Sequence, residues 1–114
     1  MDSCLFCKIA SGKLSAKIIY QDEQVTAFRD IHPVAPSHIL IIPNKHIASI
    51  NALEESDERI VGHMFIVAKQ IAQQENIAVG GYRSIINTGS DSGQTVHHMH
   101  LHIIGGHPLR FPMG

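Results

Sequence analysis

The sequence predicts one α+β domain over residues 1–114, in which an antiparallel sheet of about five strands packs against one long and one short helix. Three observations predict this architecture. A length of 114 residues suits a single domain that buries its own hydrophobic core. Short apolar runs separated by glycine, proline and aspartate are typical of strands. One longer stretch repeats apolar residues every three or four positions, which indicates an amphipathic helix.

The first third of the chain predicts a short helix followed by a β-hairpin. Residues 4–10 favour the helix, with Ser3 as its cap and Gly12 after its end. Residues 17–20 and 25–29 predict two strands, and the polar residues between them fit a hairpin turn.

A loop, a buried strand and the long helix come next. Two prolines interrupt regular structure within residues 30–36, because proline fixes φ and removes a backbone donor. Residues 39–42 (ILII) predict a strand that is buried on both faces. Residues 57–74 predict the long helix, and we assign its Met64 and Phe65 to the core.

The last third predicts two strands joined by a turn-rich loop. Residues 82–87 form the first strand, residues 89–93 (GSDSG) the loop, and residues 96–104 (VHHMHLHII) the second strand. A strand sends alternate side chains to opposite faces. The second strand therefore has a histidine face and an apolar face. These carry His98, His100 and His102 on one side and Met99, Leu101 and Ile103 on the other.

The row of three histidines predicts a reaction site, with a metal site and a solvated face as alternatives. A buried imidazole needs hydrogen-bond partners for its ring nitrogens, so three in a row are costly without a function. At a rise of ~3.3 Å per residue, the Cα atoms of His98 and His102 lie ~13 Å apart. A metal ion with ligand nitrogens ~2 Å away can use two neighbours of this row, but hardly all three.

Composition and charge exclude several classes of function. With 44% hydrophobic and 17% charged residues, the chain has the composition of a soluble globular protein. A net charge of −1 without a Lys/Arg cluster argues against nucleic acid as a partner. No apolar run reaches the ~18 residues of a membrane span, and Asp2 does not suit a signal peptide. We therefore expect no membrane partner and a cytoplasmic location.

The loop before the histidines carries residue types that bind phosphate. Glycines let backbone N–H groups approach an oxyanion, and hydroxyl and amide side chains add donors. Residues of these types are Asn87, Gly89, Ser90, Ser92, Gly93, Gln94 and Thr95. Taken alone, such a loop is more often a simple turn, and it lacks the Walker sequence. Its position beside the histidines favours a phosphate site.

His100 is the candidate nucleophile, because it has a histidine on either side. Imidazole attacks phosphorus near neutral pH, since its pKa is near 6.5 and its phosphorylated form remains a good donor. His38 is expected to reach the same site from another strand. These residues suggest nucleotidyl transfer through a phosphohistidine.

Five stretches of the chain carry a family pattern in a fixed order. They are LFCKI at residues 5–9, AFRDI at 27–31, APSHILIIP at 35–43, NTGSDSGQTVHHMHLHIIGG at 87–106, and the closing FPMG. Together they resemble the nucleotide-binding Hint branch of the histidine-triad (HIT) family over almost the whole chain. The resemblance implies a HIT-like fold, a homodimer, and hydrolysis of purine nucleoside phosphoramidates and related conjugates. The expected ligand is an AMP- or GMP-like purine nucleotide, and catalysis needs no cofactor.

The resemblance also implies roles for single residues. His100 would attack the α-phosphorus, and the surrounding histidines are His38, His98 and His102. Asn87, Gly93 and Thr95 match phosphate-contacting positions, and the Thr95 hydroxyl would also help the leaving group depart. Asp30 matches the position that holds the ribose hydroxyls, for which a carboxylate is a suitable acceptor. The positions matching an apolar slot for the base are Leu5, Phe6, Leu14, Phe28 and Ile31, and for each of them ordinary core packing is the alternative.

Two positions depart from the family pattern. Ser15 stands where the branch often has proline, and Phe111 stands where its tail has tryptophan. Because the tail is thought to shape selectivity for the leaving group, Phe111 leaves the preferred substrate open.

The CxxC pair of Cys4 and Cys7 predicts either a metal site or two reduced thiols packed in the core. In some relatives of the family, residues matching His46 and His98 complete a tetrahedral zinc set with such a pair. Four protein ligands leave no open position for substrate, so a zinc ion here would be structural.

Two rival functions stay open on the sequence. One is hydrolysis of dinucleoside polyphosphates, as in a neighbouring branch of the family, although Gly105 and Gly106 and the short tail look more like Hint. The other is a nucleotide-binding regulatory module with little physiological turnover, against which the intact nucleophile position argues.

Overall fold

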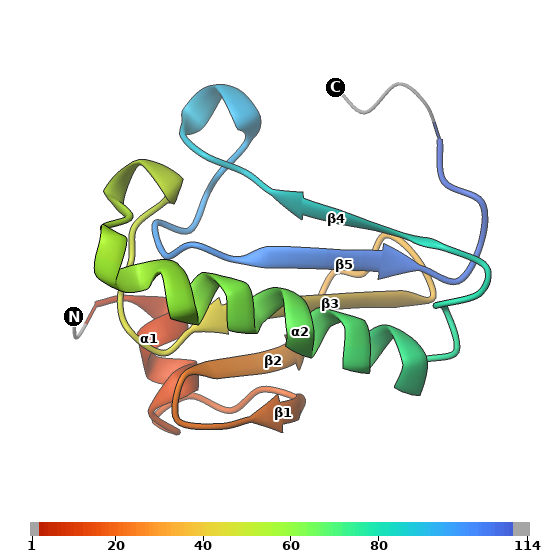
Figure 1. The fold of residues 1–114 in the computed structure, drawn as a ribbon, viewed down its shortest axis with the longest axis horizontal. Coiled ribbons are helices and arrows are strands. Elements are labelled where there is room, and N and C mark those ends of the chain that lie inside the picture. Colours follow the sequence, from red (N-terminus) through yellow and green to blue (C-terminus); the bar gives the residue numbers. More distant parts are fainter. Residues whose placement is uncertain (1–2, 111–114) are drawn as a thin grey trace.

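A five-stranded antiparallel sheet forms the centre of the protein, as the sequence predicts (Figure 1). The computed structural model describes residues 3–110. The strands are β1 (Ile18–Gln21), β2 (Val25–Arg29), β3 (Ser37–Pro43), β4 (Tyr82–Ile86) and β5 (Leu101–Gly105). Their order across the sheet is β1-β2-β3-β5-β4, so β5 lies between β3 and β4. The predicted class, α+β with five strands and two α-helices, is confirmed.

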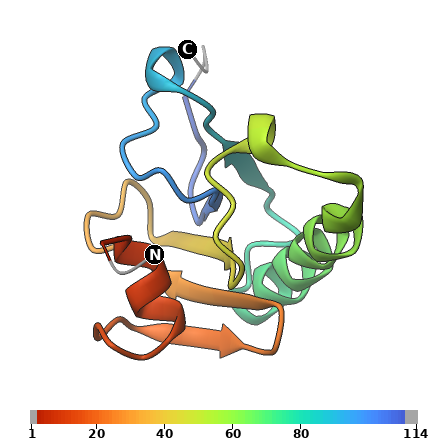
Figure 2. The same ribbon diagram turned by 90° about the vertical axis from the view of Figure 1, so that its left-hand side faces the viewer.

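The two helices cover opposite faces of this sheet (Figure 2). Helix α2 (Glu58–Gln74) crosses one face, and the short helix α1 (Leu5–Ala10) lies on the other, beside β2 and β3. Short 3-10 helices occupy residues 50–52, 55–57 and 90–92. None of the described helices is long and apolar enough to cross a membrane.

Strand β3 is the centre of the sheet and is buried at every position, as its continuous apolar run predicts. It pairs with β2 on one side and with β5 on the other. His38 lies inside β3, opposite Ile104 of β5, and not before the strand as expected. This pairing brings His38 beside the histidine segment, although the two are far apart in the sequence.

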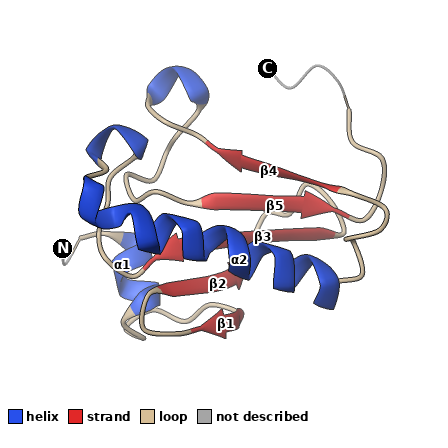
Figure 3. Ribbon diagram, viewed as in Figure 1, coloured by secondary structure: helices blue, strands red, loops and turns tan. Residues whose placement is uncertain are grey.

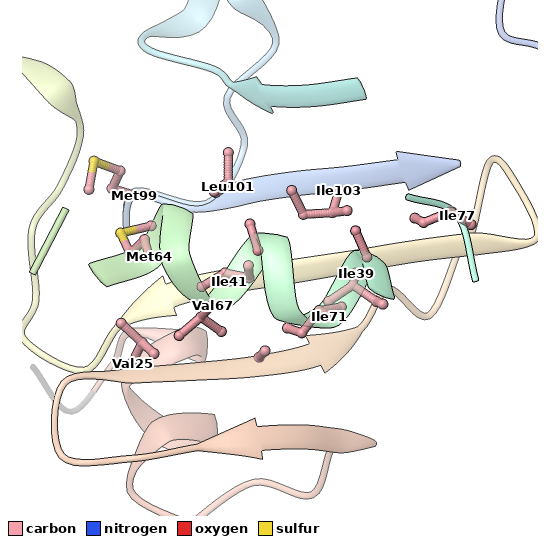
Figure 4. Close-up of a cluster of buried hydrophobic side chains, with 13 residues drawn as sticks. Val25, Ile39, Ile41, Met64, Val67, Ile71, Ile77, Met99, Leu101 and Ile103 are labelled. Carbon is pink, nitrogen blue, oxygen red and sulfur yellow. The ribbon is translucent and has the colours of Figure 1, made fainter. Parts of the chain in front are cut away.

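The larger core fills the space between α2 and the sheet (Figure 4). Met64, Val67 and Ile71 of α2 point at the sheet, and each is at most 1% exposed. The sheet side chains that they meet include Val25, Ile39, Ile41, Met99, Leu101 and Ile103. The alternation of histidine and apolar residues therefore has the predicted effect: Met99, Leu101 and Ile103 enter this core.

Phe65 of α2 lies outside the core, contrary to the expectation. It is 46% exposed and its neighbour Ile66 is 55% exposed, whereas Met64 is fully buried. A helix with 3.6 residues per turn turns successive side chains by about 100°, so two residues following a core position face away from the sheet. An apolar surface on α2 results.

The start of the short helix differs from the prediction. Cys4, and not Ser3, is the N-cap, because its Sγ accepts a hydrogen bond from the backbone N–H of Cys7 at 3.4 Å. The helix ends at Ala10, and Gly12 follows with φ +81°, a conformation that suits glycine.

The histidine strand is shorter than predicted (Figure 3). Strand β5 begins at Leu101, whereas residues 96–100 form no strand. The cause is a bond outside the sheet: the Met99 N–H donates to the carbonyl oxygen of Ile47 at 2.7 Å. This bond ties the segment to the chain that follows β3. His98 and His100 consequently lie on an irregular segment, and His102 lies in the strand.

An ion pair fixes the end of α2 to the sheet. Both Arg29 Nη atoms donate to the two carboxylate oxygens of Glu75 at 2.8 Å, and Ser37 Oγ donates to Glu75 Oε1 at 2.9 Å. The guanidinium lowers the pKa of the Glu75 carboxyl. This contact holds the end of β2 and the start of β3, which border the site described next.

Candidate active site

His100 is held in one tautomer by the backbone. Its Nδ1–H donates to the carbonyl oxygen of His98 at 2.8 Å, so the lone pair lies on Nε2. The side chain is 7% exposed. Its ring lies 4.9 Å from that of His102 and 5.1 Å from the ring of Phe6, centroid to centroid. In the neutral ring fixed in this way, Nε2 is the nitrogen available for nucleophilic attack.

His38 and His102 form a second contact beside it. The two rings are linked between His38 Nε2 and His102 Nδ1 at 2.9 Å, and Asp30 Oδ2 lies 3.4 Å from the same His38 nitrogen. Burial, together with the neighbouring His100 and His38, lowers the pKa of His102 to about 4. Burial also lowers the pKa of His38, against the opposing effect of Asp30. Both rings are therefore neutral near pH 7.

A cavity of about 620 Å³ opens next to this pair. Asp30, Ile31 and His38 line it, together with Ser15, Lys17 and Pro36. Ile31 is 84% exposed at its edge. The cavity has the volume of a small-molecule site and combines apolar walls with few polar groups. Of the residues matched to an apolar slot, Ile31 is the one that lines it.

The other four residues matched to that slot lie elsewhere. Phe6 and Phe28 are 5% and 4% exposed and pack edge to face, with ring centroids 5.4 Å apart, in the smaller core under α1. Leu5 and Leu14 are 46% and 38% exposed. In this structure the two phenylalanines are core residues, and Phe6 also contacts His100.

The glycine-rich loop ends at the histidines, as predicted. Gly89 and Gly93 have φ of +81° and +91°, conformations that glycine adopts without strain. Asn87 is half-buried directly after β4, and Thr95 is exposed. Glycine at these two positions thus lets the backbone turn sharply ahead of the histidine segment.

Gln94 is buried and holds the loop from within. Its Oε1 accepts the Gly89 N–H at 2.9 Å, while its Nε2 donates to the carbonyl oxygens of Ala48 and Val96 at 2.8 and 3.0 Å. The side chain is 6% exposed. Sequence reasoning grouped Gln94 with the phosphate donors and missed this bracing function.

Cys4, Cys7, His46 and His98 form a compact cluster under the active site. One donor atom from each lies within 4.8 Å of all the others. The Sγ atoms of Cys4 and Cys7 lie 3.3 and 3.5 Å from His98 Nδ1. The Cys7 Sγ also lies 3.3 Å from His46 Nδ1. Two sulfurs and two imidazole nitrogens at these separations match the Cys₂His₂ donor set of a structural zinc site.

Both ring nitrogens of His98 are already engaged. Nε2–H donates to the carbonyl oxygen of Pro43 at 2.7 Å, which leaves the Nδ1 lone pair directed at the thiols. Burial lowers the pKa of His98, so the neutral ring that a metal requires is favoured. Within the row, His98 contacts His100 through its carbonyl oxygen and the two cysteines through its ring.

Sequence reasoning also missed Arg29, Lys17 and Pro36, which line the cavity. Whether these side chains line the cavity depends on strand pairing and on the path of the loop at residues 30–36. The AFRDI string placed Arg29 next to Asp30, and this adjacency was the one signal available.

A family model described as "Scavenger mRNA decapping enzyme C-term binding" matches residues 3–111. Purine nucleoside phosphoramidase of Escherichia coli (strain K12) is 49% identical over 108 residues, which cover 95% of this chain and 91% of the relative.

Solved structures agree with these matches. A HIT family hydrolase from Legionella pneumophila Philadelphia 1 superimposes with a TM-score of 0.96 at 46% identity, covering 98% of this chain and 100% of that one. A histidine triad protein from Clostridium difficile gives a TM-score of 0.94 at 43% identity, covering 98% and 96%.

Proposed function

Because this chain belongs to the histidine-triad family, on its Hint-like side, we propose that it is a hydrolase of purine nucleoside phosphoramidates and related nucleoside monophosphate conjugates. The observation that carries the proposal is the fixed tautomer of His100, whose Nδ1–H is bound to the His98 carbonyl oxygen and whose ring lies 4.9 Å from that of His102. The 49% identity to a purine nucleoside phosphoramidase supports the substrate class.

The reaction proceeds in two displacements at phosphorus. His100 Nε2 forms a bond to the α-phosphorus as the P–N bond to the leaving amine breaks, and the amine takes up a proton, for which the Thr95 hydroxyl is the candidate donor. Water then forms a P–O bond as the P–Nε2 bond breaks, and the proton that the water loses returns to the Thr95 oxygen. This step releases the nucleoside monophosphate and restores the imidazole.

The nucleotide would occupy the cavity and the glycine-rich loop. Asp30 is the candidate acceptor for the ribose hydroxyls, and Ile31 would contact the base. Asn87 and the backbone around Gly93 are candidate phosphate donors. His102 is neutral near pH 7, so it would serve as a hydrogen-bond donor and not as a fixed positive charge.

A turnover experiment tests the proposal against its rivals. The protein is incubated with an adenosine phosphoramidate and, separately, with a diadenosine polyphosphate, and AMP release is measured. Faster release from the phosphoramidate supports the proposal, and faster release from the polyphosphate favours the rival hydrolase. Binding without release from either favours a regulatory module.

The His100→Asn variant tests the nucleophile directly. Asn removes the attacking nitrogen and keeps some hydrogen bonding, so nucleotide should still bind while turnover falls by several orders of magnitude. An acid-labile, base-stable nucleotide label should be trapped on the wild type and be absent from the variant. His98→Asn and His102→Asn should cost less, and near-normal turnover by His100→Asn would reject the assignment.

We further propose that Cys4, Cys7, His46 and His98 hold a structural zinc ion in the reducing cytoplasm. The donor set and the Pro43 bond to His98 support this. Metal analysis of protein made without a histidine tag should give about one zinc per chain. Cys4→Ser should lose the metal and melt at a lower temperature, whereas a wild type that is metal-free and equally stable contradicts a zinc site.

We also propose a homodimer. Strand β4 lies at an edge of the sheet, and α2 exposes Phe65 and Ile66. Light scattering at micromolar concentration should give twice the chain mass of 12.5 kDa, and Ile66→Glu should weaken the association. A monomeric mass for the wild type contradicts this proposal.

A further inference from the structure

One N–H of His38 has two acceptors within reach. The backbone N–H of Val34 donates to His38 Nδ1 at 3.2 Å, so the ring hydrogen is on Nε2. That nitrogen lies 2.9 Å from His102 Nδ1 and 3.4 Å from Asp30 Oδ2. His38 is 6% exposed, so water does not compete freely for this hydrogen. The imidazole of His102 is therefore the nearer acceptor for this hydrogen, and the carboxylate of Asp30 is a competing acceptor farther away.

The carboxylate of Asp30 is fixed in orientation but can still accept further hydrogen bonds. Its Oδ1 accepts the His32 N–H at 2.8 Å, which sets the orientation of the group. Its Oδ2 faces His38, and both Asp30 and His38 line the cavity. A carboxylate has about four acceptor positions, so hydroxyl groups entering the cavity can bind beside the histidine contact.

We propose that ribose hydroxyls bound at Asp30 direct the His38 Nε2–H to His102, so that recognition of the sugar positions the catalytic histidines. The inference rests on the proposed function. Two hydroxyl donors reduce the attraction of the carboxylate for a third donor. The His38 hydrogen then bonds to His102 Nδ1, which fixes the hydrogen of the neutral His102 ring on Nε2.

Asp30 is in this scheme a ribose contact that also acts as a positioning residue through His38. A contact that only binds sugar would change KM and leave the chemical step alone. The relay predicts that the hydroxyls also change the rate of the chemical step. A substrate without them leaves the His38 hydrogen shared between two acceptors, and His102 is less well oriented.

Kinetics on two substrates and three proteins test the relay. The substrates are adenosine phosphoramidate and its 2′,3′-dideoxy analogue, and the proteins are the wild type, Asp30→Asn and Glu23→Gln. Asn keeps an oxygen for the His32 N–H and presents an NH₂ group to His38, which cannot accept. Glu23→Gln makes the same carboxylate-to-amide change on the exposed β1–β2 turn.

The single-turnover rate and KM are measured for each combination. In the wild type and in Glu23→Gln, loss of the hydroxyls should lower the single-turnover rate roughly three- to tenfold, the effect of one hydrogen bond on a rate. In Asp30→Asn the two substrates should react at rates within about twofold of each other. A wild-type difference confined to KM overturns the relay, as does full discrimination by Asp30→Asn.

A spectroscopic measurement tests the relay independently of turnover. The ¹H resonance of His38 Nε2–H is followed in the wild type with AMP and with 2′,3′-dideoxy-AMP. A shift to lower field with AMP supports transfer of the hydrogen bond to the His102 nitrogen, and identical shifts overturn it. Absence of turnover on adenosine phosphoramidate would reject the proposed function, and the resonance would still decide the relay.

Discussion

The half-buried, neutral His102 predicts a specific pH dependence of stability. In the folded protein the pKa of this ring is about 4, whereas an unfolded histidine takes up its proton near 6.5. Between these two pH values the unfolded state binds more protons than the folded state. The free energy of unfolding therefore falls as the pH is lowered from 6.5 to 4, and above 6.5 this group contributes no pH dependence.

The magnitude follows from the two pKa values. One pH unit between them equals about 1.36 kcal/mol, so His102 alone removes about 2 kcal/mol by pH 5 and about 3 kcal/mol by pH 4. The perturbation is His102→Asn, because the Asn side-chain oxygen can replace Nδ1 as the acceptor for His38. His98, whose pKa is also lowered by burial, is present in both proteins and is shifted by other neighbours than His102. Its contribution therefore cancels in the difference between wild type and variant.

Urea unfolding of wild type and His102→Asn at pH values from 7.5 to 5.0 measures this difference. The stability advantage of the wild type should shrink by about 2 kcal/mol across that range. The ring-carbon NMR resonance of His102 should titrate with a midpoint near 4. A constant stability difference, or a midpoint near 6.5, would refute the account of His102 as a neutral donor.

Two further substitution pairs test packing around the site. Ile71→Ala should cost about 2–5 kcal/mol of unfolding free energy in urea, because the side chain is 1% exposed, while Ile66→Ala, at 55% exposed, should cost less than about 0.5 kcal/mol if measured on the monomer. Gly106→Ala should cost about 1–3 kcal/mol and raise KM, since φ is +109° and the added Cβ would lie 2.8 Å from Cβ of Pro36, a wall of the cavity. Gly62→Ala, in open space on α2, should stabilise the protein by up to about 1 kcal/mol, and equal effects at both glycines would contradict the steric argument.

Local patterns in the sequence predicted those features of the fold that are determined by residues close together in the chain. The apolar run of β3, the period of α2 and the alternation around His100 each determine burial within a few residues. These signals were sufficient to predict the sheet, both helices and the side of the histidine segment that enters the core. They also placed Gly89 and Gly93 in a loop with positive φ.

Contacts between distant segments were outside the reach of these patterns. The bond from Met99 to Ile47 shortens β5, and no local feature of VHHMHLHII encodes it. The sequence favours a base slot over core packing for Phe6 and Phe28, whereas in the structure their rings pack edge to face in the smaller core. Predictions at Phe111 lie outside the described residues.

The position of β5 between β3 and β4 also determines when the site can form during folding. Contacts between Cys4 and His98 span 94 residues, and His38 meets His102 across 64. Such long loops are closed late, because their entropy must be lost before the contacts form. Strands β1 to β3 pair between near neighbours and can assemble first, during synthesis from the amino terminus. A growing chain therefore cannot assemble the histidine site until residues 98–105 have been made and have docked against β3.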